Sequence, residues 1–183
     1  MAKHGLLFER DPFIEKCINR AGIFTEDLDG GDCVVLDKVN ANDKELYDVV
    51  KYTTGKRVCV LYNPSVKYDV INEKKFPAKS LDDRDYYNPK NTPFDMFIPE
   101  KDVVFGITGA NIKEDDVASL EVGKMLKPEA STGKYCLTTA STGTGVDSTE
   151  PAFKIEEISS VKYPTGDFSD DKETVYFVRT IQN

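Results

Sequence analysis

Histidine and tryptophan are almost missing from this chain of 183 residues, which has no tryptophan and a single histidine, His4. Catalysis by a Ser–His–Asp or Cys–His arrangement needs a titratable imidazole, and His4 is the only one in the chain. The four cysteines are far apart, with no CxxC pair, so the sequence gives no support to a zinc site. We expect buried free thiols, no metal, no cofactor and no enzymatic activity.

Long hydrophobic runs and clusters of positive charge are also missing. The apolar run from Val103 to Ile107 is far shorter than a bilayer span, and the first residues show no secretory signal. We therefore expect no membrane contact, and folding in a cytoplasm. Lysine and arginine number 24 against 32 acidic residues, which gives a net charge of −8. Nucleic acid is not an expected partner, because binding it depends on clustered positive charge.

Two short motifs resemble ligand-binding loops but miss required positions. The segment DLDGGD, from Asp27 to Asp32, has glycine at the fifth position and aspartate at the sixth, where a calcium loop needs an oxygen ligand and a glycine. We interpret it as a solvated turn. The segment STGK at 131–134 has Pro128 where a phosphate loop needs its first glycine, and Tyr135 where it needs Ser or Thr.

Alternating apolar residues between turn signals predict a mainly β fold, a barrel or sandwich of about seven to eight strands. The stretch 120–140 is typical of a β-hairpin with Gly133 in its turn. The polar stretch 112–119 predicts a short turn or helical piece. Further strands are expected at 32–39, 45–52, 58–62, 101–108, 152–161 and 174–181.

Residues 1–21 are predicted to form an N-terminal arm and a short helix, ahead of a single β-rich domain at 22–183. Asp11 and Pro12 are typical of a helix start, and Gly22 of a helix end. Phe13, Ile14, Cys17 and Ile18 would share one face of this helix.

The arm itself carries three apolar residues, Leu6, Leu7 and Phe8, with no partner inside the segment. Two interpretations stay open. In one the arm packs on its own domain, and in the other it docks on a neighbouring subunit.

The stretch 63–101 is predicted to be a long irregular excursion, inserted in the domain. Asn63-Pro64 ends the preceding strand, and the stretch carries five prolines, which do not favour regular strand pairing. It is also rich in tyrosine and phenylalanine, too apolar for a disordered linker. Packing against the core is the favoured interpretation, and a sugar-binding surface with Tyr86 and Tyr87 is the alternative.

The order of these segments is similar to that of small structural proteins of tailed bacteriophages, which are encoded beside the major capsid protein and decorate the head. The resemblance covers roughly residues 22–181, and the Pro- and aromatic-rich stretch at 72–97 and the TGTG loop depart from it. It rests on the segments GIFTEDLDGGDCVVLDKV, ELYDVVKY, RVCVLYNPSVKYD, IPEKDVVFGIT and EVGKMLKPEASTGKYCL.

The resemblance implies a capsid decoration protein: a structural virion protein that binds the outside of the phage capsid and reinforces contacts between capsomers. Its partner would be the major capsid protein, with neighbouring copies of itself as a further candidate. Leu6, Leu7, Phe8 and Phe13 are the residues expected to face the capsid. The alternatives are another virion component, such as a tail or head–tail joining protein, and a carbohydrate-binding or hydrolytic module.

Overall fold

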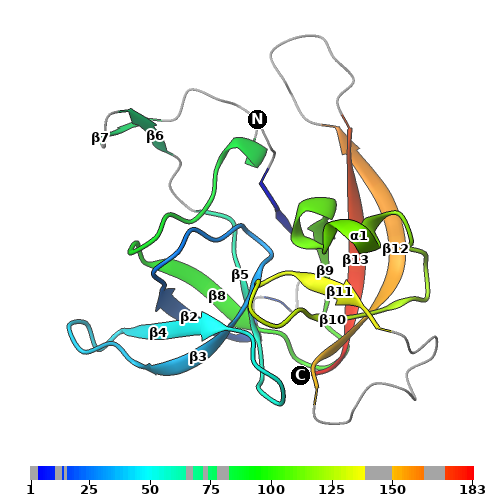
Figure 1. Ribbon diagram of the computed structural model, residues 1–183, viewed down its shortest axis with the longest axis horizontal. Helices are drawn as coiled ribbons and strands as arrows, with labels where there is room; N and C mark the ends of the chain where they lie inside the picture. Colours follow the sequence, from blue (N-terminus) through cyan, green and yellow to red (C-terminus); the bar gives the residue numbers. More distant parts are fainter. Residues whose placement is uncertain are drawn as a thin grey trace.

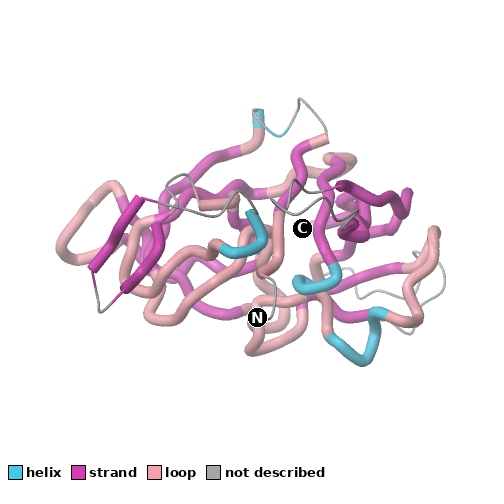
Figure 2. The backbone as a smooth tube through the Cα atoms, turned by 90° about the horizontal axis from the view of Figure 1, so that it is seen from above, coloured by secondary structure: helices cyan, strands magenta, loops and turns pink. Residues whose placement is uncertain are grey.

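The chain is mainly β in the computed structural model, which describes residues 4–10, 14, 16–64, 68–71, 74–77, 83–138, 150–162 and 172–183. Strands make up most of the regular structure, and the helical segments are short turns (Figure 2). A closed five-stranded barrel and a six-stranded sheet form the body of the molecule, with a separate two-stranded hairpin (Figure 1). None of the described helices is long and apolar enough to cross a membrane.

The barrel comes from residues 18–98 and has the strand order β2–β4–β3–β5–β8. β2 pairs parallel with β4 and antiparallel with β8, and the second pairing closes the ring. Buried apolar side chains fill the barrel, among them Phe94 and Met96 of β8. The five strands are β2 (Ile18–Ile23), β3 (Cys33–Val39), β4 (Leu46–Lys51), β5 (Cys59–Leu61) and β8 (Phe94–Ile98).

The six-stranded sheet is antiparallel, with the order β1–β9–β13–β12–β10–β11. Its first strand comes from the N-terminal arm, and the other five come from the second half of the chain. A short 3₁₀ turn η3 (Gly109–Asn111) and a one-turn helix α1 (Glu114–Val117) lie between β9 and β10. The strands are β1 (Leu7–Glu9), β9 (Val104–Thr108), β10 (Met125–Pro128), β11 (Tyr135–Leu137), β12 (Ala152–Lys162) and β13 (Lys172–Gln182).

A chain of aromatic rings connects the barrel to the sheet. Phe97 of β8 packs edge-on against Phe105 of β9, with ring centroids 5.8 Å apart, and Phe105 packs against Phe153 of β12 at 5.7 Å. Phe153 in turn meets Tyr135 of β11 at 5.4 Å. All four side chains are fully buried and belong to one core that both sheets share. This core holds the barrel and the sheet together.

The predicted mainly β class and the predicted hairpin are confirmed. β10 and β11 pair antiparallel, and Gly133 in the turn between them has a φ of +80°, which glycine adopts without strain. All six other segments expected to contain a strand do so, and β12 and β13 extend one or two residues beyond the expected bounds. All four cysteines are free, and three of them are buried.

The predicted N-terminal helix is wrong for its second half: Ile14 and Lys16 are 3₁₀-helical, but Ile18–Ile23 is strand β2. The expected helix start at Asp11 and Pro12 lies outside the described residues. Gly22 is not a helix end. It sits in β2, where a Cβ atom would lie only 2.8 Å from the Met96 methyl group in the barrel interior. Pairing with β8 and β4 outweighs the helical spacing of the apolar residues.

The stretch 63–101 contains more regular structure than the sequence suggests. β8 fits between Pro93 and Pro99, so no proline interrupts it, and it completes the barrel. β6 (Tyr68–Ile71) and β7 (Lys74–Pro77) form the separate hairpin, and a 3₁₀ turn η2 (Asp83–Asp85) follows. The described residues contain thirteen strands, more than expected, because several of them are short.

Replacing Phe105 by alanine tests the shared core. We expect Phe105→Ala to lower the free energy of unfolding by about 3–5 kcal/mol, because it removes a ring that packs on two others. The control Val122→Ala, at a side chain that is 62% exposed, should change it by less than about 0.5 kcal/mol. Urea unfolding followed by circular dichroism should show one transition. Two separate transitions would contradict a shared core.

Candidate functional site

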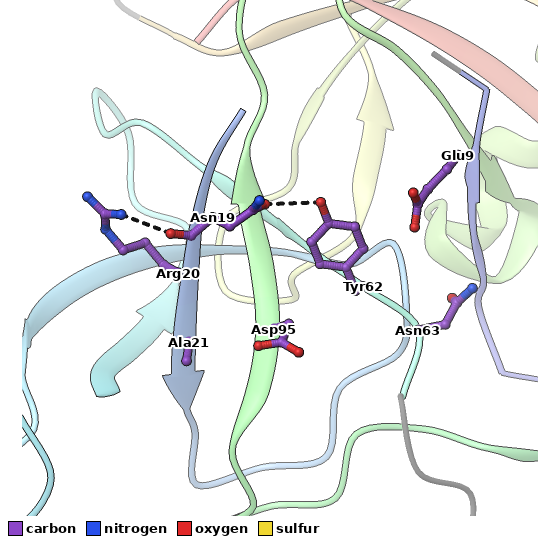
Figure 3. A pocket seen from close by; sticks show the side chains of 7 residues that line it. All are labelled: Glu9, Asn19, Arg20, Ala21, Tyr62, Asn63 and Asp95. Atoms are coloured by element: carbon purple, nitrogen blue, oxygen red, sulfur yellow. Dashed lines mark hydrogen bonds between the residues drawn. The ribbon is translucent and has the colours of Figure 1, made fainter. Parts of the chain in front are cut away.

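A polar groove opens between the edge strand β1 and the barrel strands β2 and β8 (Figure 3). Its volume of about 630 Å³ falls within the range of roughly 300–1,000 Å³ that is typical of small-ligand pockets. The groove is lined by Glu9 of β1, Asn19, Arg20 and Ala21 of β2, Tyr62 and Asn63 after β5, and Asp95 of β8. Residues that are far apart in the sequence therefore meet where the barrel and the sheet adjoin.

The aromatic ring of the groove is held in place by three contacts. The Tyr62 hydroxyl donates a hydrogen bond to Asn19 Oδ1 at 3.1 Å, and the ring packs against Phe97 with centroids 5.2 Å apart. The Tyr62 backbone N–H donates to the carbonyl of Asp95 at 3.0 Å. Figure 3 shows the half-buried ring in the middle of the labelled side chains. The ring is therefore positioned before any ligand arrives.

Asn63 joins the groove to the edge of the sheet. Its Oδ1 accepts a hydrogen bond from the Leu7 backbone N–H, and its Nδ2 donates to the Leu7 carbonyl, both at 2.8 Å. The side-chain amide thus takes the place of a neighbouring strand beside β1 and satisfies backbone groups at this edge. Both ends of the amide are used, so Asn63 contributes rigidity to the groove.

The charged groups of the groove sum to −1. Glu9 and Asp95 are exposed carboxylates, and within the described part of the chain neither side chain has a hydrogen-bond or ion-pair partner. Arg20 Nη1 donates to the backbone carbonyl of Asn19 at 2.8 Å, so the one cation stays at the rim (Figure 3). The open acceptors of the groove are thus mainly carboxylate oxygens.

A buried polar junction lies beneath the N-terminal arm, next to Gly5. Asp32 is 5% exposed, and its Oδ1 accepts a hydrogen bond from Asn111 Nδ2 while its Oδ2 accepts one from the Asp29 backbone N–H, both at 3.0 Å. Asn111 Nδ2 also donates to the Gly30 carbonyl at 2.8 Å, and Asn111 Oδ1 accepts hydrogen bonds from Thr108. The buried carboxylate and the buried amide therefore satisfy each other.

The N-terminal arm closes onto this junction. Asp29 Oδ1 lies 2.8 Å from His4 Nδ1, and Asp29 Oδ2 accepts a hydrogen bond from the Gly5 backbone N–H at 2.9 Å. The Leu6 backbone N–H donates to Thr108 Oγ1 at 3.3 Å. These bonds attach the arm to the turn before β3 and to the end of β9.

The interpretation of DLDGGD as a solvated turn is wrong for its second half. Gly30, Gly31 and Asp32 are buried, because the turn packs beneath the arm and against η3. Burial raises the pKa of the Asp32 carboxyl from 3.8 to about 7, with a smaller contribution from the charge of Asp29.

Two of the four residues expected to face a capsid, Leu6 and Leu7, are buried. Leu6 and Leu7 are 2% and 3% exposed, and Phe8 is half-buried opposite Gly106 in the β1–β9 pairing. Phe13 lies outside the described residues. This position favours the interpretation in which the arm packs on its own domain, and it leaves Leu6 and Leu7 no surface to offer a partner.

The two tyrosines expected to form a sugar-binding surface are also buried or half-buried. Tyr86 is 4% exposed, and Tyr87 packs its half-buried ring against His4 with centroids 4.8 Å apart. Tyr86 therefore has no surface to offer a ligand, and His4 covers part of the Tyr87 ring. The sequence marks Asn63 only as the end of a strand, and no spacing within it indicates that Tyr62 meets Asn19 and Asp95.

A second feature of the surface is a ribbon formed by the far ends of β12 and β13. Within the described part of the chain, no third strand pairs with Ser159–Lys162 or with Lys172–Thr174, because β9 pairs with β13 at Val175–Arg179 and β10 pairs with β12 near Phe153. Figure 1 shows this end extending past the other strands of the sheet. We call these two segments the distal ribbon.

We compared the chain with protein families, curated proteins and solved structures. No family model, curated protein or solved structure matches it. Among the residues that the structure describes, no three His, Cys, Asp or Glu side chains are grouped so that they could hold a metal ion.

The Asp32 carboxyl should make stability depend on pH. Its pKa is higher in the folded chain, at about 7, than its ordinary 3.8, so its stabilising contribution is complete at low pH and is lost as the pH rises towards 7. Relative to Asp32→Asn, which cannot ionise, the unmodified chain should lose about 3 kcal/mol of unfolding free energy between about pH 4 and pH 7. Urea titrations at a series of pH values measure this difference. A difference that stays constant with pH would contradict the account.

Proposed function

We propose that the chain is a structural virion protein that binds the outside of a phage capsid and reinforces contacts between capsomers. The observation that carries this proposal is the layout of the strands. The segments on which the resemblance to phage head proteins rests form β3, β4, β5, β9 and the β10–β11 hairpin. The pattern of segments therefore corresponds to a pattern of folded elements, which supports the resemblance.

The distal ribbon is the surface that we assign to capsid contact. Among the described residues the distal ribbon has no third strand on either side, so a neighbouring capsomer that packed on it would bury these strand edges. Ile158, next to the ribbon on β12, is 38% exposed and offers an apolar contact point. Leu6 and Leu7 are not part of this proposal, since the chain's own core buries them.

The charge of the chain suits an outer position. With a net charge of −8, the protein would repel packaged DNA on the inner surface of a capsid, whereas the outer surface carries no such penalty. A protein that binds the assembled capsid but not its free subunits stabilises the assembled state by mass action, and the effect adds up over many bound copies. A small contact area per copy is then enough.

Co-sedimentation with capsids tests the proposal. Purified protein should bind capsids of the phage whose genome encodes the chain, and binding should saturate in a fixed ratio to the major capsid protein. We expect Ile158→Asp to weaken this binding by at least about tenfold, because it places a charge directly beside the distal ribbon, where a docked capsomer would cover it.

The matched control is Val122→Asp, which introduces the same charge at an exposed apolar residue that lies outside the distal ribbon. This variant should bind like the unmodified chain. Thermal unfolding of both variants verifies that they fold. If the unmodified chain does not sediment with capsids, the proposed function is wrong. If the two variants bind equally well, the assignment to the distal ribbon is wrong.

A further inference from the structure

We propose that the groove between β1, β2 and β8 is a binding site for a neutral saccharide, with Tyr62 as the surface on which a sugar ring lies. This inference goes beyond capsid binding and does not depend on it. The argument rests on the charge of the groove, its hydrogen-bonding groups, its aromatic ring and its size.

The negative charge of the groove disfavours anionic small ligands. Glu9 and Asp95 carry two negative charges, and the guanidinium of Arg20 is engaged with the Asn19 carbonyl at the rim. A phosphate, a nucleotide or a carboxylic acid would be repelled here. The groove therefore suits a ligand that is neutral or positively charged.

The hydrogen-bonding groups favour a neutral, hydroxyl-rich ligand over a cation. Asn19 uses its Oδ1 to accept the hydrogen bond from Tyr62, which leaves its Nδ2 as a donor facing the groove. Asp95 and Glu9 offer acceptors, and Arg20 adds further donors at the rim. A sugar hydroxyl both donates and accepts, so it can use both kinds of group. A lysine or arginine side chain of a partner could use only the acceptors.

The Tyr62 ring supplies the apolar part of such a site. One side of the ring packs against Phe97, and the hydroxyl is fixed by Asn19, so the ring does not have to be ordered when a ligand binds. A rigid, amphipathic ring among polar groups suits the C–H face of a pyranose, whose rim carries the hydroxyls. Asn63 keeps the opposite wall in place through its two bonds to Leu7.

The size of the groove also favours a small ligand. Seven residues line it, whereas a standard protein interface uses about 20–30 residues on each side. The groove is therefore too small to be a complete protein-docking surface, and its volume of about 630 Å³ suits a short oligosaccharide.

The experiment is a binding screen of the full chain. The probes are a printed panel of neutral di- to tetrasaccharides of hexoses and N-acetylhexosamines, and a lysine- and arginine-rich decapeptide. The best saccharide is then titrated by isothermal calorimetry. Tyr62→Ala and Asp95→Ala should each weaken its binding by at least about tenfold. Asp95 is exposed and its side chain has no partner among the described residues, so its variant should fold even if Tyr62→Ala does not.

The matched control is Tyr87→Ala, which removes a tyrosine of similar exposure outside the groove. It should change the affinity by less than about twofold. The inference is wrong if no saccharide of the panel binds, or if the decapeptide is bound in the groove in place of a saccharide. It is also wrong if Asp95→Ala binds as tightly as the unmodified chain. None of these results affects the capsid-binding test, which uses other residues.

Discussion

The side-chain amide of Asn111 is the contact on which the rest of the structure depends. It is fully buried, and it joins the turn before β3 to the end of β9 by bonding Gly30, Asp32 and Thr108. The arm must pass directly over it, since a Cβ atom on Gly5 would lie 2.3 Å from Asn111 Nδ2. Loss of this amide would remove the donor that the Gly30 carbonyl and Asp32 Oδ1 share, and a buried acceptor that loses its donor costs about 1–3 kcal/mol.

The junction also determines what the surface can do. Because it holds the arm in place, β1 can pair with β9, and Asn63 can close the other edge of β1. The β1 wall of the groove stays fixed only while both the β1–β9 pairing and the hydrogen bonds from Asn63 are in place. The aromatic core between barrel and sheet holds the opposite wall, because Tyr62 packs on Phe97. The groove is therefore a consequence of how the two sheets join, whereas the distal ribbon extends away from that joint.

Local patterns predict much of this fold. Alternation and turn residues identify β3, β4, β5, β9 and the β10–β11 hairpin, because those signals act within a few residues. The strand β2 is mistaken for a helix, since its place depends on β8, more than 70 residues later in the chain. The burial of Asp32 depends in the same way on Asn111, 79 residues away. Long-range contacts of this kind leave no local signal, and the groove is made entirely of them.

The central claim is that this chain is a component of a phage particle. The most direct measurement is quantitative mass spectrometry of purified particles of the phage whose genome encodes it. The account predicts that the chain is present in a simple ratio to the major capsid protein, as expected of a protein that covers a symmetric lattice. A few copies confined to one vertex or to the tail would indicate a joining or tail protein. Absence from the particle would contradict the account.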